Sequence, residues 1–406
     1  MSLRKPADRP QRLAILGATG SIGSSTLDIV RRHPERFRVI ALSANRDAEG
    51  LLKLVEEFHP KVVCLADSAA AEAFRKYLGT RLHKEIFIVS GAAGLEELAQ
   101  LSDVDTVVAG IVGVAGLPSV LAAARSGKRV LLANKEAMVC AGSLLVDTAV
   151  HSGATILPID SEHNAIFQAL GSQYRCFNRP EHVRRVLLTA SGGPFREWPL
   201  ESIRSATVAQ ALKHPNWTMG KKITVDSATM ANKGLEWIEA HWLFALPPQE
   251  IQIVVHPESI VHSMVEFADA STIAQLGPPD MRTPIANALA WPDRIESGSS
   301  YLDWATVGSL RFEPPDPIRF PALRLAAGCL ESGQAASNIF NAANEQAVDA
   351  FLEGRICFGQ IQDGVEAVLD ALEGRFPEPG SLDDVIQIDR EARTMTNHWI
   401  SMNEQS

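Results

Sequence analysis

The stretch ILPIDSEHN, residues 156–164, ends an apolar run with two carboxylates. Asp160 and Glu162 flank Ser161, and in extended backbone residues two positions apart lie on one face. Such a pair repels itself unless a cation lies between the carboxylates or both face water. With Glu236 they make three hard oxygen ligands, which suit Mg²⁺ or Mn²⁺. The alternative is a solvated acidic loop.

Two further motifs carry hydrogen-bond donors of the kind found around a phosphate. TVDSATMANKGLE (224–236) supplies Ser227, Asn232 and Lys233, and TASGG supplies Ser191 followed by two glycines. Glu236 follows Lys233 by three residues, which places both on one helix face. The alternative for this pair is a surface ion pair, which contributes little to stability.

The segment HPNWTMGKK, residues 214–222, has the composition of a loop but contains an indole. We expect residues 211–222 to form a lid in which Trp217 covers a bound ligand. The alternative is that Trp217 belongs to the core. The later motif HPESIVHSM adds His256 and His262, for each of which a purely structural role stays open.

The motif LLANKE ends an apolar run with the polar triplet Asn134, Lys135 and Glu136. Ligands of open α/β sheets bind beyond the carboxyl ends of the strands, so this triplet is well placed for binding. The alternative is the polar first turn of a helix.

The N-terminal motif LAILGATGSIGSS has the features of a dinucleotide-binding loop. Gly17, Gly20 and Gly23 follow an apolar run and precede a helical pattern. The spacing is GxxGxxG, and a tight turn with helix N-terminal amides can bind a pyrophosphate. A purely structural turn is the alternative.

The second apolar run ends in ALSANRD, where dinucleotide-binding proteins read the ribose. Arg46 is a cation for a 2′-phosphate, and Asn45 can also donate, whereas Asp47 argues for an unphosphorylated ribose. We therefore expect NADP rather than NAD.

The elements that must position these residues follow two sequence patterns. Up to about residue 160, buried apolar runs alternate with helical stretches, which predicts a doubly wound parallel sheet. From 161 to about 300 we expect an α+β region with a largely antiparallel sheet, and beyond a Pro-rich connector at 313–321 only helices and a frayed terminal segment. The expected strands of the first region are residues 13–16, 37–44, 62–66, 85–90, 106–110, 129–133 and 155–159.

Composition excludes several classes of protein. The 406 residues carry a formal net charge of −10, which argues against a nucleic-acid binder. The five cysteines are scattered and form no CxxC motif, as expected of reduced thiols in the cytoplasm. No apolar run is long enough to span a bilayer, so we expect no membrane partner.

The motifs GATGSIG, LLANKE, PIDSEHN, TASGGPFR, HPNWTMGKKITVDSATMANKGLE and HPESIVHSMVEF occur in one order. In this the chain closely resembles the 1-deoxy-D-xylulose 5-phosphate reductoisomerases of non-mevalonate isoprenoid synthesis. The resemblance runs from about residue 12 to 400. It implies a homodimer with an NADPH-binding domain (1–160), a catalytic and dimerisation domain (161–312) and a C-terminal helical domain (313–406).

The resemblance also implies roles for individual residues. Asp160, Glu162 and Glu236 correspond to ligands of the divalent metal, and Lys135 and Ser161 to contacts with the sugar backbone. The family often has a Gly-Lys-Asn-like run where this chain has Asn45, Arg46 and Asp47, so a cation is kept but its geometry differs. The phosphate pocket corresponds to Ser191, Ser227, Asn232 and Lys233, the lid to His214 and Trp217, and the cofactor contacts to Thr19, Gly20, Ser21, Ile22, Asn134, Glu136 and Gly220.

The implied reaction converts the sugar phosphate to 2-C-methyl-D-erythritol 4-phosphate by retro-aldol cleavage, re-addition and hydride transfer from NADPH. One rival is a semialdehyde dehydrogenase, which needs a nucleophilic cysteine. Cys140 and Cys176 are the nearest candidates, and neither lies in a polar motif. A second rival is a non-catalytic NADPH-sensing protein, which needs no metal ligands.

Overall fold

The computed structural model describes residues 9–78, 86–217 and 219–404. The chain divides into two compact units, and each contains segments that are distant in the sequence. The first unit comprises Met1–Ala137, Leu145–Asn164 and Asp280–Ser300. The second comprises Met138–Leu144, Ala165–Pro279 and Tyr301–Ser406. The predicted three-domain boundaries at 160 and 312 stay a prediction.

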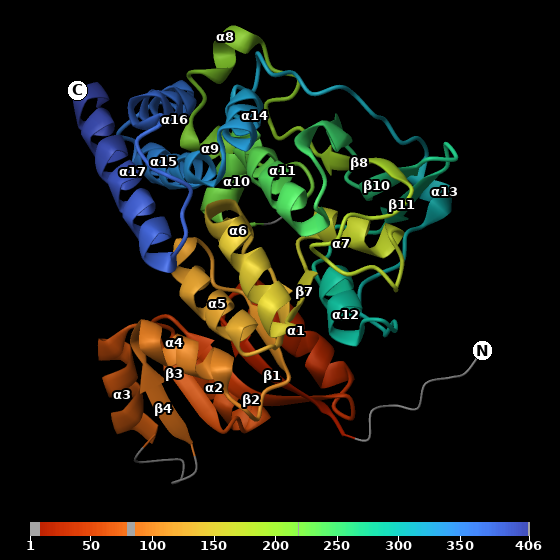
Figure 1. Ribbon diagram of the computed structural model, residues 1–406, viewed down its shortest axis with the longest axis vertical. Coiled ribbons are helices and arrows are strands. Elements are labelled where there is room, and N and C mark those ends of the chain that lie inside the picture. The colour runs from red at the N-terminus through yellow and green to blue at the C-terminus, as the bar shows by residue number, and fades with distance from the viewer. Residues whose placement is uncertain (1–8, 79–85, 218, 405–406) are drawn as a thin grey trace. The chain divides into compact units, whose positions relative to one another are not determined.

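The first unit is built on a parallel sheet of seven strands in the order β4-β3-β2-β1-β5-β6-β7, flanked by helices (Figure 1). The chain moves outward from β1 to β4 and then returns to the other side of β1, so the order reverses between β1 and β5. This confirms the doubly wound sheet. The strands are β1 Gln11–Leu16, β2 Phe37–Ala44, β3 Val62–Leu65, β4 Phe87–Ser90, β5 Thr106–Ala109, β6 Arg129–Leu132 and β7 Thr155–Pro158.

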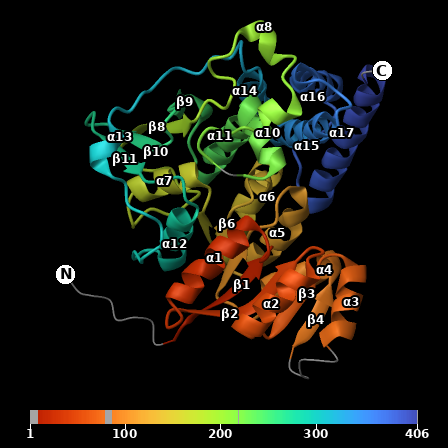
Figure 2. The same ribbon diagram turned by 180° about the vertical axis from the view of Figure 1, so that it is seen from behind.

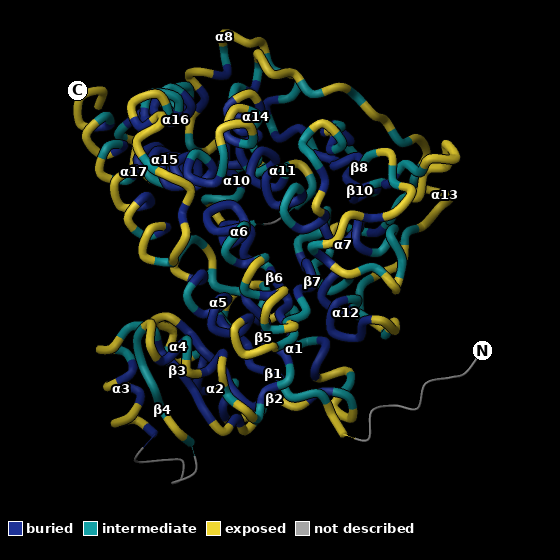
Figure 3. The backbone as a smooth tube through the Cα atoms, in the orientation of Figure 1, coloured by how far each residue is buried: buried dark blue, intermediate teal, exposed yellow. Residues whose placement is uncertain are grey.

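Buried strands and amphipathic helices give this unit its core. The last four residues of β1 are buried, and most of this strand is dark blue in Figure 3. Seen from behind in Figure 2, α1 lies beside β1. The helices of this unit are α1 Ser21–Arg32, α2 Ala48–Phe58, α3 Ser68–Leu78, α4 Gly91–Gln100, η1 Val114–Gly116, α5 Leu117–Arg125 and α12 Arg282–Ala290.

The helix α6, Lys135–Ser152, is interrupted at Ala141, where φ is −144° and ψ is 35°. It contributes its first turn and its last two turns to the first unit and residues 138–144 to the second. Helix α7, Ser161–Ala169, likewise begins in the first unit and continues in the second.

The second unit contains a sheet of four strands in the order β11-β10-β8-β9. The β10 strand pairs antiparallel with β8 and β11, whereas β8 and β9 are parallel. Two of its three pairings are thus antiparallel, as expected, and β10 with β11 forms the predicted hairpin. The strands are β8 Val183–Ala190, β9 Ile251–Val255, β10 Val261–Phe267 and β11 Thr272–Leu276.

Helices form the rest of the second unit. The expected frayed terminus is wrong, because α17 runs from Leu382 to Asn403. Ser381 caps it by accepting from the Asp384 N–H, and Ile388, Ala392 and Ile400 are buried on one face at intervals of four or eight residues. The remaining helices are α8 Leu200–Ile203, α9 Val208–Ala211, α10 Lys221–Thr229, α11 Ala231–Phe244, η2 Pro248–Glu250, α13 Trp304–Val307, α14 Ala322–Ser332, α15 Gln334–Leu352 and α16 Phe358–Leu372.

The Pro-rich connector is attached to the second sheet. The backbone N–H and C=O of Glu313 pair with those of Val255, both at 2.9 Å. In the described ranges no helix combines the length and apolar character needed to cross a bilayer. No disulfide joins any of the five cysteines, all of which lie in the described part of the chain.

Candidate functional site

The glycine loop connects β1 to α1 at the point where the strand order reverses. Gly17 has φ +78°, which disfavours any other residue. A Cβ on Gly23 would come within 2.5 Å of the Ala18 Cα, so a side chain there would force the helix away from the loop. Gly20 precedes the first turn of α1 and is exposed. Thr19, Gly20, Ser21 and Ile22 therefore lie at the N-terminus of α1, where helix amides can bind a pyrophosphate.

The tip of β2 presents Asn45, Arg46 and Asp47, all of which are exposed. The Asp47 carboxylate accepts the Gly50 N–H at 2.8 Å and so caps α2. Asp47 therefore has a structural role that does not depend on binding a ribose. Arg46 donates from Nε to Oδ2 of Asp67 at 2.9 Å.

The polar triplet after β6 forms the N-cap and the first turn of α6. This is the alternative of a polar first helical turn. Asn134 is buried, its Oδ1 accepts the Ala137 N–H at 3.1 Å, and its Nδ2 donates to the Gly113 carbonyl at 2.9 Å. The side chain of Asn134 therefore fixes the start of the helix. Lys135 and Glu136 occupy the first turn and are also buried.

The backbone of residues 160–162 is not extended, so the condition for a shared strand face is not met. The β7 strand ends at Pro158 and α7 begins at Ser161, so Asp160 lies between the two elements and Glu162 in the first helical turn. Ser161 Oγ donates to Oε2 of Glu162 at 2.5 Å. The two carboxylates are neighbours because the chain turns there, and not because they share a strand face.

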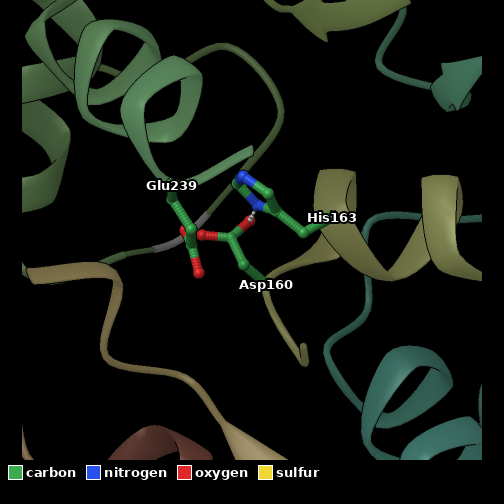
Figure 4. A group of neighbouring side chains, drawn as sticks. All are labelled: Asp160, His163 and Glu239. Atoms are coloured by element: carbon green, nitrogen blue, oxygen red, sulfur yellow. Dashed lines mark ion pairs between the residues drawn. The ribbon is translucent and has the colours of Figure 1, made fainter. Parts of the chain in front are cut away.

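A cation does lie beside Asp160 in the structure, and it is Lys135. Its Nζ lies 2.7 Å from Oδ2 of Asp160, and both side chains are largely buried. His163 Nδ1 lies 3.8 Å from Oδ1 of the same carboxylate, as the dashed line in Figure 4 shows. Burial raises the pKa of Asp160, but the charge of Lys135 and the contact with His163 outweigh it and hold that pKa well below its usual range. Asp160 is thus an ionised carboxylate.

His163 is a neighbour of the candidate ligand Asp160 that the sequence pattern did not single out. It is fully buried and lies one helical turn beyond Asp160. The signal was its spacing of three residues from a candidate ligand, which brings side chains together only if the intervening residues are helical. In extended backbone, side chains three residues apart would point to opposite faces.

In the second unit, Ser191 and His214 come together from the end of β8 and the segment after α9. The Trp217 N–H donates to Nδ1 of His214 at 2.9 Å, so Nδ1 is the acceptor nitrogen. Nε2 then carries the proton and donates to Ser191 Oγ at 3.1 Å. Burial lowers the pKa of His214 to about 4, which keeps the ring neutral at physiological pH.

The two glycines after Ser191 bring this loop against α10. Gly192 and Gly193 have φ values of +82° and +68°. A Cβ on Gly193 would come within 2.5 Å of the Ser227 carbonyl oxygen, so only glycine fits there. Backbone of the TASGG loop therefore lies next to the helix that carries Ser227.

The motif ANKGLE begins α11 after Met230, which has φ +62°. Lys233 and Glu236 form an ion pair, and their side chains are 4% and 1% exposed. Asn232 also donates to the Glu236 carboxylate. The alternative of a surface ion pair is wrong, because this pair is inside the protein and costs desolvation energy.

The expected lid, of which residue 218 lies outside the described residues, is anchored at its first half. Asn216 Nδ2 donates to the Pro257 carbonyl at 2.7 Å and to Ser259 Oγ at 2.8 Å. Trp217 is half-buried, and its ring centroid lies 6.1 Å from that of His262. Gly220 is exposed and precedes α10. These contacts leave open whether the segment closes over a ligand.

The two histidines of HPESIVHSM differ in their surroundings. His256 has a structural role, since Nδ1 contacts the Arg311 carbonyl at 2.8 Å and Nε2 accepts the Ile260 N–H at 3.1 Å. It also stacks on Phe312. Burial lowers the pKa of His262 to about 4, and its ring faces Trp217.

Three family profiles match the chain. They are described as 1-deoxy-D-xylulose 5-phosphate reductoisomerase over residues 13–142, its C-terminal domain over 156–244, and DXP reductoisomerase C-terminal domain over 276–395. A 1-deoxy-D-xylulose 5-phosphate reductoisomerase of Aromatoleum aromaticum is 54% identical, with 97% of this chain and 96% of the relative covered.

The chain belongs to the 1-deoxy-D-xylulose 5-phosphate reductoisomerase family. A member from Pseudomonas aeruginosa is 52% identical over 97% of this chain and 98% of its own. A crystal structure of a DOX-P reductoisomerase with NADPH, fosmidomycin and magnesium matches with a TM-score of 0.91 and 46% identity, covering 97% of this chain and 98% of that one. The structure of the Zymomonas mobilis enzyme with NADPH matches with a TM-score of 0.89 and 45% identity, covering 97% of this chain and 99% of that one.

Membership of this family replaces the semialdehyde dehydrogenase alternative, and the cysteines agree. Such an enzyme needs a reactive thiolate. Cys140 and Cys176 are both buried, and burial raises the pKa of Cys176. Both cysteines are therefore core residues.

Proposed function

We propose that this protein converts 1-deoxy-D-xylulose 5-phosphate to 2-C-methyl-D-erythritol 4-phosphate with NADPH and Mg²⁺ or Mn²⁺, in non-mevalonate isoprenoid precursor synthesis. The observation that carries the proposal is the family match along nearly the whole chain. It is supported by related structures that hold NADPH or magnesium. The same family membership argues against a non-catalytic NADPH sensor.

The cofactor proposal is supported by the tight glycine loop before α1. Gly17 turns the chain with a positive φ, Gly23 lets α1 pack against the loop, and Gly20 is exposed at the N-cap of α1. Arg46 supplies a cation for the 2′-phosphate. Further proposed contacts are Thr19, Ser21, Ile22, Asn45, Asp47, Asn134, Glu136 and Gly220.

We assign the divalent metal to Asp160, Glu162 and Glu236. All three residues supply carboxylate oxygens, and such hard donors suit Mg²⁺ or Mn²⁺. Asp160 is ionised in the folded protein, as a ligand must be. A bound metal would act as a Lewis acid toward substrate oxygens, and NADPH would supply the hydride. Lys135 and Ser161 are then placed beside a ligand carboxylate to contact the sugar backbone.

The phosphate group of the substrate is assigned to Ser191, Ser227, Asn232 and Lys233. The Ser191 hydroxyl accepts from neutral His214 and from the Gly193 N–H at 3.2 Å, so its own proton is left to donate to a phosphate oxygen. Lys233 brings positive charge into the protein interior. Binding at this remote end orients the reacting carbons, and Trp217 would exclude water from them.

We also propose a cytoplasmic homodimer. The second unit exposes several large apolar side chains, on β11 and in or before the connector, which are more stable when covered. Its strand β11 lies at the edge of the four-stranded sheet. Sedimentation of the purified protein tests the dimer. The exposed residues are Ile273, Tyr301, Trp304, Phe312 and Ile318.

The decisive experiment follows NADPH oxidation with 1-deoxy-D-xylulose 5-phosphate. We expect turnover with Mg²⁺ or Mn²⁺ and loss of turnover with EDTA, which metal addition reverses. Alkylation of the thiols should leave the rate unchanged. NADPH binding without turnover in the presence of metal and substrate would contradict the proposed function.

A further inference from the structure

The neighbouring tips of β2 and β3 place a carboxylate against the cation that is proposed to read the 2′-phosphate. Arg46 Nε donates to Asp67 Oδ2 at 2.9 Å, and the two side chains are 80% and 24% exposed. Among the described residues, no other hydrogen bond or ion pair of the Arg46 guanidinium is found. Nη1 and Nη2 are therefore both available to an anion from solution.

Asp67 is held in place by interactions that do not involve Arg46. Its Oδ1 accepts the Ala70 N–H at 2.9 Å, which caps α3. Its backbone N–H donates to the Asn45 carbonyl at 3.2 Å, so the sheet pairing of β2 and β3 continues past their ends. The hydrogen bond from Ala70 and then that from Arg46 lower the pKa of Asp67, which stays ionised at neutral pH.

We propose that Asp67 is a specificity-determining positioning residue that holds Arg46 by Nε and directs Nη1 and Nη2 outward to bind the 2′-phosphate of NADPH. The inference rests on the proposed function. A guanidinium binds phosphate best with two parallel N–H groups, and an exposed arginine otherwise loses much rotamer freedom on binding. Asp67 reduces that loss because it fixes one edge of the guanidinium beforehand.

The negative charge of Asp67 does not cancel this benefit. One of its oxygens faces the N-terminus of α3, where backbone amides and the helix dipole offset the carboxylate charge. The other oxygen is covered by Arg46 itself. An incoming phosphate therefore meets the free edge of the guanidinium and not the carboxylate.

The test compares kcat/KM for NADPH and NADH in Asp67→Asn. The amide oxygen can still cap α3, whereas the anion that holds Arg46 is lost. We expect the NADPH/NADH ratio to fall about three- to fivefold, the scale of one exposed ion pair, through a higher KM for NADPH with kcat unchanged. Asp67→Ser, which also keeps a cap without a charge, should give the same shift if Asp67→Asn folds poorly.

A matched control and a double variant separate positioning from a general loss of charge. Glu57→Gln removes an exposed arginine–carboxylate pair, that of Arg31 with Glu57, elsewhere in the first unit and should leave the ratio unchanged. In an Arg46→Ala background, Asp67→Asn should change the ratio less than about twofold, because the two residues act as one unit.

The outcomes distinguish this inference from the proposed function. If Arg46→Ala lowers the ratio but Asp67→Asn leaves it unchanged or raises it, Asp67 is a helix cap or a competitor, and the inference is wrong while the proposed function stands. If the unaltered enzyme shows no preference for NADPH, the cofactor assignment fails and the inference fails with it.

Discussion

Two ion pairs serve the proposed reaction from opposite environments. Arg46 and Asp67 meet at the surface of the first unit, with 80% and 24% of their side chains exposed. Lys233 and Glu236 belong to the second unit and form a buried pair, with 4% and 1% exposed. Water screens the first pair, so its loss changes recognition but little else. The second pair is shielded from water, so loss of the Lys233–Glu236 pair changes both the site and the stability of the fold.

The largest expected effect is that of Glu236→Gln, which removes one proposed metal ligand and half of the buried pair. Turnover should fall to background, since an amide is a poorer ligand than a carboxylate. NADPH binding should persist, because the glycine loop and Arg46 belong to the first unit. Kinetics with added Mg²⁺ and fluorescence titration with NADPH measure the two effects. Full activity of this variant in EDTA-treated buffer would remove the metal hypothesis.

The next effect concerns the fold. Lys233→Met keeps the length of the side chain but deprives the buried Glu236 carboxylate of this charged partner. The free energy of unfolding should drop by about 3–5 kcal/mol, as measured by urea denaturation. Lys53→Met, which breaks an exposed pair with Glu49 on α2, is the matched control and should show no measurable change. Equal stability of the two variants would mean that the buried charge partner of Glu236 does not contribute to the free energy of unfolding.

Arg46→Ala should act on cofactor choice alone. The lost charge-assisted contact should reduce the NADPH/NADH preference about tenfold, without a change in unfolding free energy. The ratio of kcat/KM values for the two cofactors measures it. An unchanged ratio would show that Arg46 does not read the 2′-phosphate.

The smallest effect is expected at the lid, residues 211–222. Lys213 is exposed, whereas Lys221 and Lys222 lie in the first turn of α10 and Lys222 pairs with Asp226 at 2.8 Å. Limited proteolysis should therefore cut first at Lys213, and metal, NADPH and a phosphonate chelator together should slow it. Trp217→Ala should lower kcat without unfolding the protein. Cleavage that is equally slow with and without ligands would make Trp217 an ordinary core residue.

Local patterns were sufficient to predict the elements and the chemistry of the motifs. Apolar runs such as LAIL and VVCL predicted buried parallel strands, because no polar residue interrupts them. The glycine motif predicted the tight turn before α1, where Gly17 has a positive φ, and the close packing of α1, in which Gly23 leaves no room for a side chain. α17 was missed because its polar residues outnumber the few buried positions that hold it.

The sequence by itself determined which residue types are available: three carboxylates, a cluster of phosphate donors, a cation after the second strand. Only the tertiary structure decided how they pair. Lys135 neutralises Asp160 because α6 and the turn after β7 meet, and His214 selects its tautomer through the Trp217 N–H. Asp67 reaches Arg46 because two strands lie side by side. These pairings join residues from separate elements, and short-range spacing carries no information about contacts that sheet order and burial create.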